Sequence, residues 1–381
     1  MALRGLVRCC RSTFHEPVVA KFCAVLNQGW LEQRTGAKRY LLSEDVIKLQ
    51  DFQLKKLAVA HLASRSEGSY IDLWSQRLER NELIQKEELK LLLHLCQSAD
   101  DMLVARKAIY RFHADNTNMG CDEFRFGPLF MRLCYEFGLE GMASAVLTDE
   151  KMRGFFNDTT SFNITLDMLF MKDSFEDALE VLRVMKKRGV WFNTDTLLLA
   201  SGICYKLNTR EAYGICTDLM EDSHTKGHMI PKHAFCFTVA LALRQNDMEG
   251  AQYFFSKIIN KSGRLCHNLR VLMLTRLGET AEALSVLSAA QKTKSPLFVK
   301  KAQFAEEVVD LLRRQSENTP QKEHVQKVLS QLEESGQVVQ HSIDDMLCHS
   351  SNERRRPPLN LDQRGSRRRS VRLPSTVLLS E

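Results

Sequence analysis

The sequence is poor in the residues that interrupt helices, with only 8 prolines and 18 glycines among 381 residues. Long helices can therefore form along most of the chain. Runs of about 18 apolar residues are also missing, so we predict no transmembrane helix and no membrane insertion. Hydrophobic residues make up 44% of the chain and charged residues 26%, which is ordinary for a globular protein with a large core.

The 11 cysteines lack the spacing of a zinc site or a disulfide framework, because no Cys-x-x-Cys pair occurs and their number is odd. This pattern indicates reduced, mostly buried thiols in a reducing compartment. Cys266 and His267 are adjacent, but a zinc site needs a second pair of ligands at suitable spacing. We therefore predict no metal and no cofactor.

The sequence motifs of catalysis are missing too. The chain has no phosphate-binding loop, nucleotide fingerprint, His-Glu-x-x-His pair or nucleophile elbow. A metal-dependent nuclease needs several carboxylates that converge on one pocket. Adjacent pairs such as Glu306-Glu307 and Asp344-Asp345 point to different faces of a helix and do not supply them. We predict that the protein is not an enzyme and has no catalytic residues.

Positive charge is concentrated at the two ends of the chain. Residues 1–39 contain seven basic and two acidic residues, and residues 350–381 contain eight arginines and three acids. Each end therefore carries +5, whereas the whole chain carries only +6, so the body between them carries −4. The basic character of the whole chain is thus no argument that the body binds nucleic acid.

The first residues form an arginine-bearing segment without acids. Arg4, Arg8 and Arg11 would share one face of a helix, and the first acidic residue is Glu16. This pattern is typical of a mitochondrial targeting segment, and the charges that interrupt the apolar stretch disfavour a secretory signal. We predict that residues 1–39 are a targeting segment and linker and that the protein enters the mitochondrion (matrix). The alternative is an unstructured basic terminus without a targeting role.

The other end, residues 341–381, combines Pro, Gly, Ser and Arg without apolar periodicity, which predicts a disordered basic tail. The clusters Arg354–Arg356 and Arg367–Arg369 could contact phosphates or an acidic partner. A solvated tail without a partner is the competing interpretation.

The middle of the chain repeats with a period near 35 residues. An alanine followed by apolar residues three and four positions later recurs at Ala105, Ala143, Ala178, Ala212, Ala251 and Ala283. Each alanine is preceded by a second amphipathic stretch, such as the one with Phe162, Leu166, Leu169 and Phe170 on one helical face. A polar dipeptide or a glycine separates the two stretches, so each unit is predicted to be a helix–turn–helix.

One such hairpin cannot bury its apolar face alone, so successive units must stack into a superhelix. We predict about six repeats over residues 87–298, an N-terminal helical cap over residues 40–86 and a C-terminal helical cap over residues 299–340. Chance spacing among ordinary helices is the alternative, and six concordant positions disfavour it.

Residues 160–193, TSFNITLDMLFMKDSFEDALEVLRVMKKRGVWFN, resemble a pentatricopeptide repeat over their whole length. The shared features are the pair Phe162-Asn163, the Glu-Asp-Ala-Leu opening of the second helix and the Met-Lys-Lys-Arg-Gly ending. The tetratricopeptide alternative expects a Trp-x-x-Leu-Gly-x-x-Tyr element, which is absent. The resemblance covers residues 40–340 and implies an all-α, right-handed α-solenoid of helix-turn-helix repeats with helical caps and a disordered C-terminal tail.

The resemblance also implies binding of single-stranded RNA, with each helix pair presenting side chains to one base. The selecting positions correspond to Asn163 and Asn193, whose amides can match a base edge. The preceding unit places Pro128 and Asp158 there, and the following unit places Leu197 in the first position. Proline and leucine cannot hydrogen-bond a base, so most of the code is unreadable.

Basic residues at the end of the same unit, Lys186, Lys187 and Arg188, are predicted to guide RNA phosphates. Ordinary structural roles compete with both assignments. Asn163 and Asn193 lie where asparagine often caps a helix, and a basic cluster suits the C-terminal end of a helix.

From these features we predict a non-enzymatic mitochondrial RNA-binding adaptor for the maturation, processing or stabilisation of transcripts, and through this for respiratory-chain function. Six units that read one base each specify a word found by chance about once in 4,000 nucleotides. We therefore expect other RNA-processing proteins as partners beside single-stranded mitochondrial RNA. The alternative is a protein-binding helical scaffold in a mitochondrial complex, which the acidic body favours.

Overall fold

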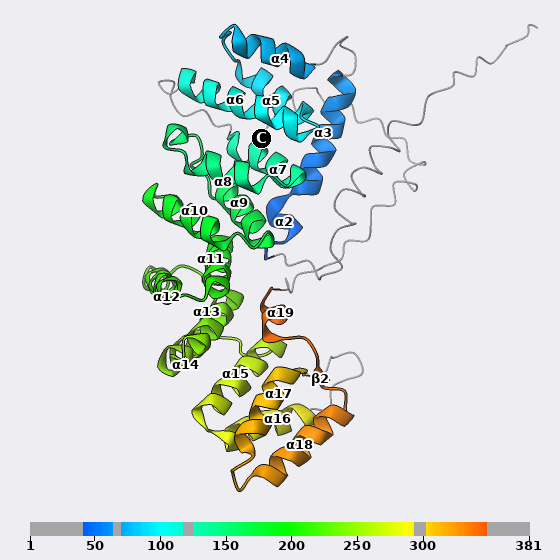
Figure 1. Ribbon diagram of the computed structural model, residues 1–381, viewed down its shortest axis with the longest axis vertical. Helices are drawn as coiled ribbons and strands as arrows, with labels where there is room; N and C mark the ends of the chain where they lie inside the picture. The colour runs from blue at the N-terminus through cyan, green and yellow to red at the C-terminus, as the bar shows by residue number, and fades with distance from the viewer. Residues whose placement is uncertain (1–40, 64–69, 117–124, 293–301, 349–381) are drawn as a thin grey trace, which may run out of the picture. The chain divides into compact units, whose positions relative to one another are not determined.

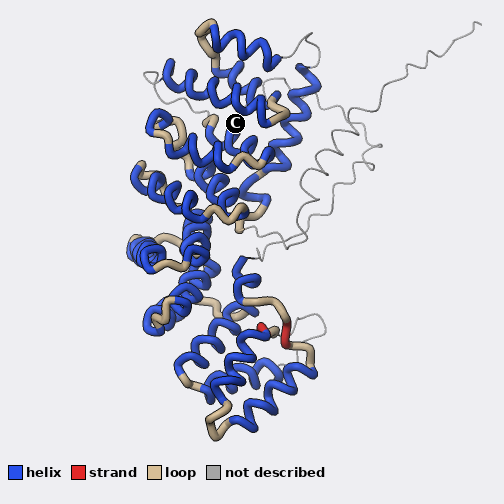
Figure 2. The backbone as a smooth tube through the Cα atoms, viewed as in Figure 1, coloured by secondary structure: helices blue, strands red, loops and turns tan. Residues whose placement is uncertain are grey.

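The computed structural model describes residues 41–63, 70–116, 125–292 and 302–348, in which helices succeed one another as stacked hairpins (Figures 1 and 2). The predicted targeting segment and residues 349–381 of the predicted tail lie outside these ranges. Residues 343–348, which the sequence assigned to the tail, instead form a buried helix. None of the helices in the described ranges is long and apolar enough to cross a bilayer.

The helices alternate between two rows. The first row contains α3 (Leu49–Ala63), α5 (Lys86–Leu95), α7 (Gly127–Phe137), α9 (Thr159–Met171), α11 (Thr194–Leu207), α13 (Lys232–Arg244), α15 (Arg264–Leu277) and α17 (Glu306–Ser316). The second row contains α4 (Tyr70–Glu79), α6 (Ala99–Asn116), α8 (Glu140–Thr148), α10 (Phe175–Lys187), α12 (Arg210–Thr225), α14 (Met248–Lys257), α16 (Thr280–Lys292) and α18 (Lys322–Glu334). Successive first-row helices pack on one another, and from α5 onward each also packs on its second-row partner.

The repeated alanines lie where the second row meets the first. All six, Ala105, Ala143, Ala178, Ala212, Ala251 and Ala283, have an exposed fraction of 0%. A methyl group at this point lets the two helices approach closely, and a larger side chain would separate them. The apolar stripe of α9 is buried as well, with Phe162, Leu166, Leu169 and Phe170 at 1% exposure or less. The predicted all-α solenoid of helix-turn-helix repeats is confirmed.

Left-handed residues form the turns inside the units. Gly138, Asp173, Asn208, Asn246 and Gly278 all have φ between 50° and 81°. Glycine and asparagine enter this region at little cost, and aspartate does so more readily than most residues. The next residue then caps the second helix in two units, where Thr209 accepts a hydrogen bond from the Ala212 amide and Asp247 accepts one from the Gly250 amide. The residue types at each turn and at the following N-cap position therefore account for these turns.

Short elements complete the described part of the chain. They are α2 (Glu44–Ile47), the 3₁₀ helix η1 (Glu150–Met152), α19 (Ile343–Cys348) and a parallel pair of two-residue strands, β1 (Phe304–Ala305) and β2 (Val338–Val339). The buried Gln337 donates from its side-chain amide to the Ala302 carbonyl at 2.9 Å, next to this strand pair. The pairing of β2 with β1 thus holds the segment that follows α18 beside the start of α17, which is a first-row helix.

Glycine at position 127 permits the close contact between the start of α7 and the start of α9. A Cβ atom on Gly127 would lie 2.5 Å from Ser161 Oγ and 2.8 Å from Asp158 Oδ2. We expect Gly127→Ala to lower the free energy of unfolding by about 1–3 kcal/mol, because one of the two helices must shift. Urea denaturation followed by circular dichroism measures this loss.

Gly141 in α8 provides the matched control, because a Cβ atom there would meet no atom within 4 Å. Gly141→Ala should leave the stability unchanged or raise it by about 0.5–1 kcal/mol, since alanine restricts the unfolded chain. Equal effects of the two substitutions would contradict the close contact.

Candidate nucleic-acid interface

The first-row helices have one side that does not pack against the second row, and we call it the open face. Two segments of the same chain lie on it, residues 41–48 (the N-terminal strap) and residues 340–348 (the C-terminal strap). The N-terminal strap buries Leu41 and Leu42, and its Ile47 carbonyl accepts a hydrogen bond from Arg132 Nε of α7 at 2.7 Å. It therefore covers the open face from α7 to α11, where a Cβ atom on Gly202 would lie 2.8 Å from Leu41 Cδ1.

A buried carboxylate on α9 holds the N-terminal strap. Asp167 Oδ1 accepts the Leu42 amide at 3.2 Å, and Oδ2 accepts the Tyr135 hydroxyl at 3.2 Å. Burial raises the pKa of Asp167 to about 7, and these hydrogen bonds oppose that rise. The carboxyl is therefore a structural group that carries its charge only at a cost.

The C-terminal strap is held by charge at one end and by hydrogen bonding and burial at the other. The Asp344 carboxylate lies 2.6 Å from Lys206 Nζ of α11 and 3.6 Å from Arg244 NH2 of α13. At the other end, the Leu347 carbonyl accepts a hydrogen bond of 2.6 Å from His233 Nε2. Burial lowers the pKa of His233, which favours the neutral ring. Helix α19 packs on α13 and α15, so this strap covers the open face farther along the rows.

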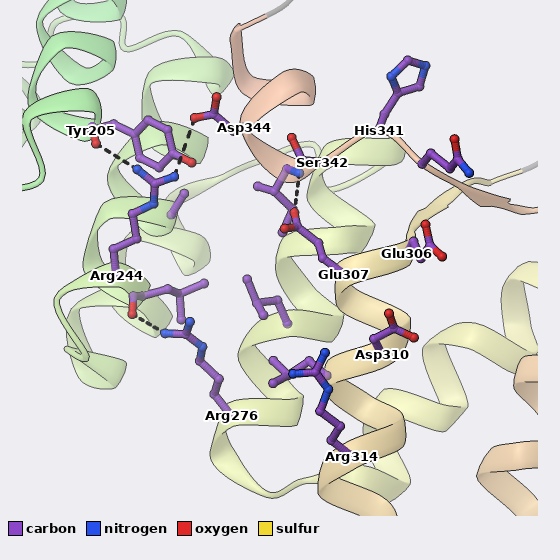
Figure 3. Close-up of a pocket in the computed structure, with 16 residues that line it drawn as sticks. Tyr205, Arg244, Arg276, Glu306, Glu307, Asp310, Arg314, His341, Ser342 and Asp344 are labelled. Carbon is purple, nitrogen blue, oxygen red and sulfur yellow. Dashed lines mark hydrogen bonds and ion pairs between the residues drawn. The ribbon is translucent and has the colours of Figure 1, made fainter.

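A pocket of about 560 Å³ lies between the C-terminal strap and the helices α13, α15 and α17 (Figure 3). Three arginines line it, Arg244, Arg276 and Arg314, each at or near the C-terminal end of its helix. Arg244 stacks on the Tyr205 ring, with its guanidinium carbon 3.9 Å from the ring centroid. Arg276 donates to the Leu243 carbonyl. These three cations, together with Lys206, therefore follow the open face at one cation per unit.

Acidic groups share the pocket with the arginines. Glu306, Glu307 and Asp310 of α17 line it, and Glu307 accepts the Ile343 amide at 2.5 Å. Asp310 pairs with Arg313 at 2.9 Å. The pocket is thus lined by both basic and acidic side chains, unlike an anion-binding site that is lined by basic side chains alone. Within the described ranges, no group of three His, Cys, Asp or Glu side chains is arranged to hold a metal ion.

The two predicted base-reading asparagines are brought together, but they bind each other. Asn163 Nδ2 donates to Asn193 Oδ1 at 3.0 Å, and Asn163 Oδ1 accepts the Thr196 hydroxyl at 2.7 Å. Asn193 also caps α11 by accepting the Thr196 amide at 2.9 Å. Asn163 is only 2% exposed, whereas Asn193 is half-buried. The capping role of Asn193 is therefore present in the structure, and contact of either residue with RNA stays a prediction.

The other predicted RNA-binding residues occupy structural positions as well. Asp158 is buried and caps α9, accepting the Ser161 amide at 2.7 Å. Lys187 forms an exposed ion pair with Glu150 at 2.7 Å, and Arg188 donates to the Asp149 carbonyl at 2.9 Å. Lys186 is exposed. This basic cluster ends α10 and therefore belongs to the second row, away from the open face.

The sequence contained a signal for the cations on the open face that periodicity alone did not reveal. Lys206 precedes the alanine of its unit by six residues, and Arg244 and Arg276 precede theirs by seven. Alignment of the units on their alanines would have placed Arg244 and Arg276 in one column and Lys206 in the adjacent column. By contrast, no local pattern pairs Leu42 with Asp167, which are 125 residues apart.

The cysteines that the structure describes are buried, as the sequence predicted. Cys96, Cys134, Cys204, Cys216, Cys236, Cys266 and Cys348 are all free and buried. The Cys236 and Cys266 sulfur atoms lie 3.8 Å apart, which is too long for a disulfide bond.

Comparison with known proteins gives several relatives. No family model matches the chain. The chain is 50% identical over 88% of both chains to the pentatricopeptide repeat-containing protein 2, mitochondrial, of Danio rerio. It is 42% identical to the Mus musculus and Homo sapiens proteins of the same name, over 91% of its own length and 91% and 89% of theirs.

Among solved structures, a pentatricopeptide repeat protein from maize matches 85% of this chain and 52% of its own, with 13% identity and a TM-score of 0.36. The sequence relatives, which span nearly the whole chain, show the family. The chain belongs to the family of the mitochondrial pentatricopeptide repeat-containing protein 2.

Proposed function

We propose that this protein is a non-catalytic RNA-binding adaptor of the mitochondrial matrix. It holds a single-stranded segment of a transcript along the open face and thereby supports RNA maturation, processing or stability, and through these the respiratory chain. The observation that carries the proposal is the row of cations, Lys206, Arg244, Arg276 and Arg314, on successive first-row helices. A strand with one phosphate per nucleotide is the natural ligand for evenly repeated positive charge.

Magnitudes favour binding that is modest and dependent on salt. If all four cations contact phosphates, the logarithm of the RNA affinity should fall with the logarithm of salt concentration with a slope of about −3. The body of the chain is acidic, so it adds little attraction of longer range. Partners that add their own RNA contacts would raise the affinity by linking the sites.

The row of cations gives a direct test. The double variant Arg276→Gln/Arg314→Gln should weaken binding of a labelled single-stranded RNA and make the salt slope shallower by about 1.4, because two phosphate contacts are lost. Fluorescence anisotropy at several salt concentrations measures both quantities.

A double variant in the second row, Arg183→Gln/Lys226→Gln, changes the net charge equally. Both of its residues form exposed ion pairs on that row, with Glu211 and Asp222. This control should leave the salt slope nearly unchanged. Equal loss of affinity in both double variants would mean that only bulk charge matters and that the open face is not the RNA site.

The asparagine pair separates base reading from structure. Asn163→Ala removes two hydrogen bonds between neighbouring units, so it should lower the free energy of unfolding by about 1–3 kcal/mol whether or not RNA binds. Chemical denaturation measures this loss. If Asn163 also reads a base, crosslinking in intact cells should show a discrete mitochondrial RNA footprint that disappears in Asn163→Ala/Asn193→Ala at equal folded protein. A footprint that is unchanged would leave both asparagines with a structural role only.

A second candidate function is a protein-binding scaffold. The open face already holds two peptide segments of its own chain, and the body of the chain is acidic. A face that accepts extended peptide in this way could accept a subunit of a mitochondrial complex. Recovery of a protein partner without RNA in the same crosslinking experiment would favour the scaffold.

A further inference from the structure

We propose that the C-terminal strap is a displaceable cover that occupies the anion sites of Lys206 and Arg244 and leaves when single-stranded RNA binds the open face. This inference rests on the RNA-binding function proposed above. It adds a competition within the chain, in which a segment of the protein and the RNA use the same cations.

The strap supplies the kind of group that RNA would supply. Asp344 presents one carboxylate to cations from two neighbouring units, with its oxygens 2.6 and 2.8 Å from Lys206 Nζ. The side chain of Lys206 is 11% exposed and that of Asp344 is 25% exposed. Lys206 is therefore mostly covered, and its ammonium group is already paired, while the strap is in place. Only departure of Asp344 completes the row of four cations.

The pocket behind the strap gives the strand a place to start. Arg276 and Arg314 line this pocket, and neither forms an ion pair with the residues that the structure describes. Residues 340–344 form the opposite wall, so one side of this part of the strap borders the pocket, although Ile343 within it is buried (Figure 3). Phosphates bound at these two arginines would lie next to the Asp344 contact and could displace it stepwise.

The two straps differ in the groups that each one contributes to its contacts with the open face. At the N-terminal strap, the open face supplies the carboxylate of Asp167 and the strap supplies backbone amides. An anionic ligand cannot take the place of those amides. At the C-terminal strap, the open face supplies two cations, Lys206 and Arg244, to the carboxylate of Asp344, although Glu307 of α17 also accepts the Ile343 amide. Only the contact of Asp344 with its two cations can therefore be exchanged for a contact with a polyanion.

The strap is also small enough to move as a unit. Helix α19 has six residues. Besides Asp344, it is attached by the Ile343 amide, which donates to Glu307 at 2.5 Å, and by the buried Leu347, whose carbonyl bonds to His233. The chain before it is fixed by the pairing of β2 with β1, which lies outside the cation row. Release of residues 340–348 would break these contacts and expose Ile343, Met346, Leu347 and Cys348, while the contacts between the stacked helices themselves would stay in place.

Three variants test the cover. Asp344→Asn removes the charge that holds the strap, and Leu347→Ala loosens its other end without any change of charge. Asp222→Asn is the control, because it removes a carboxylate that pairs with Lys226 on second-row α12. Affinity for a labelled oligouridylate is measured by anisotropy on the full chain, and hydrogen exchange of residues 343–348 is followed with and without RNA.

We expect Asp344→Asn and Leu347→Ala each to bind RNA about fivefold more tightly or better, since a larger fraction of molecules has the face exposed. Asp222→Asn should change the affinity less than about twofold. Addition of RNA to the unmodified chain should accelerate exchange at residues 343–348. Circular dichroism confirms that each variant is folded.

Two other results would overturn the cover. If the unmodified chain binds RNA, but residues 343–348 stay protected and neither strap variant binds more tightly than the control, the strap does not compete and RNA binding itself stands. If no variant binds RNA, including those with the strap released, both the cover and the RNA function are wrong.

Discussion

The contact between the two helices of each unit at a fully buried alanine is the constraint on which the rest of the structure depends. Six such alanines have no exposed surface, and each sets how closely its second-row helix approaches the first row. That spacing decides which side of every first-row helix is used for packing and which side remains as the open face. The same contact recurs about every 35 residues, so successive units pack in the same way. Cations at equivalent positions of successive units therefore line up in a row.

Charge on the open face is balanced by the chain itself. The face offers a carboxylate at α9 and cations at α11 and α13, and segments from opposite ends of the described chain satisfy each of them. The acidic body and the occupied cations explain why net charge does not point to this surface as the proposed nucleic-acid site. The cations of the open face are available to another ligand only where no segment of the chain pairs with them.

Much of the fold could be predicted because its signals are local. The alanines, the stripe on α9 and the turn residues at positions 138, 208 and 246 act within a few neighbours along the chain. The site was less predictable. Asn193 suits a helix cap as well as a base, and the pattern cannot separate the two. Helix α19 is too short for apolar periodicity, and contacts with residues more than 100 positions away hold it in place. It was therefore assigned to the tail.

The two-residue strand pair has a consequence for the kinetics of the open face. Because β2 is paired with β1, residues 340–348 would remain tethered a few residues from their site if they dissociate as proposed. A tethered competitor has a local concentration on the order of millimolar, whatever the concentration of the protein. Short oligonucleotides would be expelled quickly by such a competitor, whereas a long strand that holds several arginines at once would persist. The strand pair would thus make the face a filter for the length of its ligand.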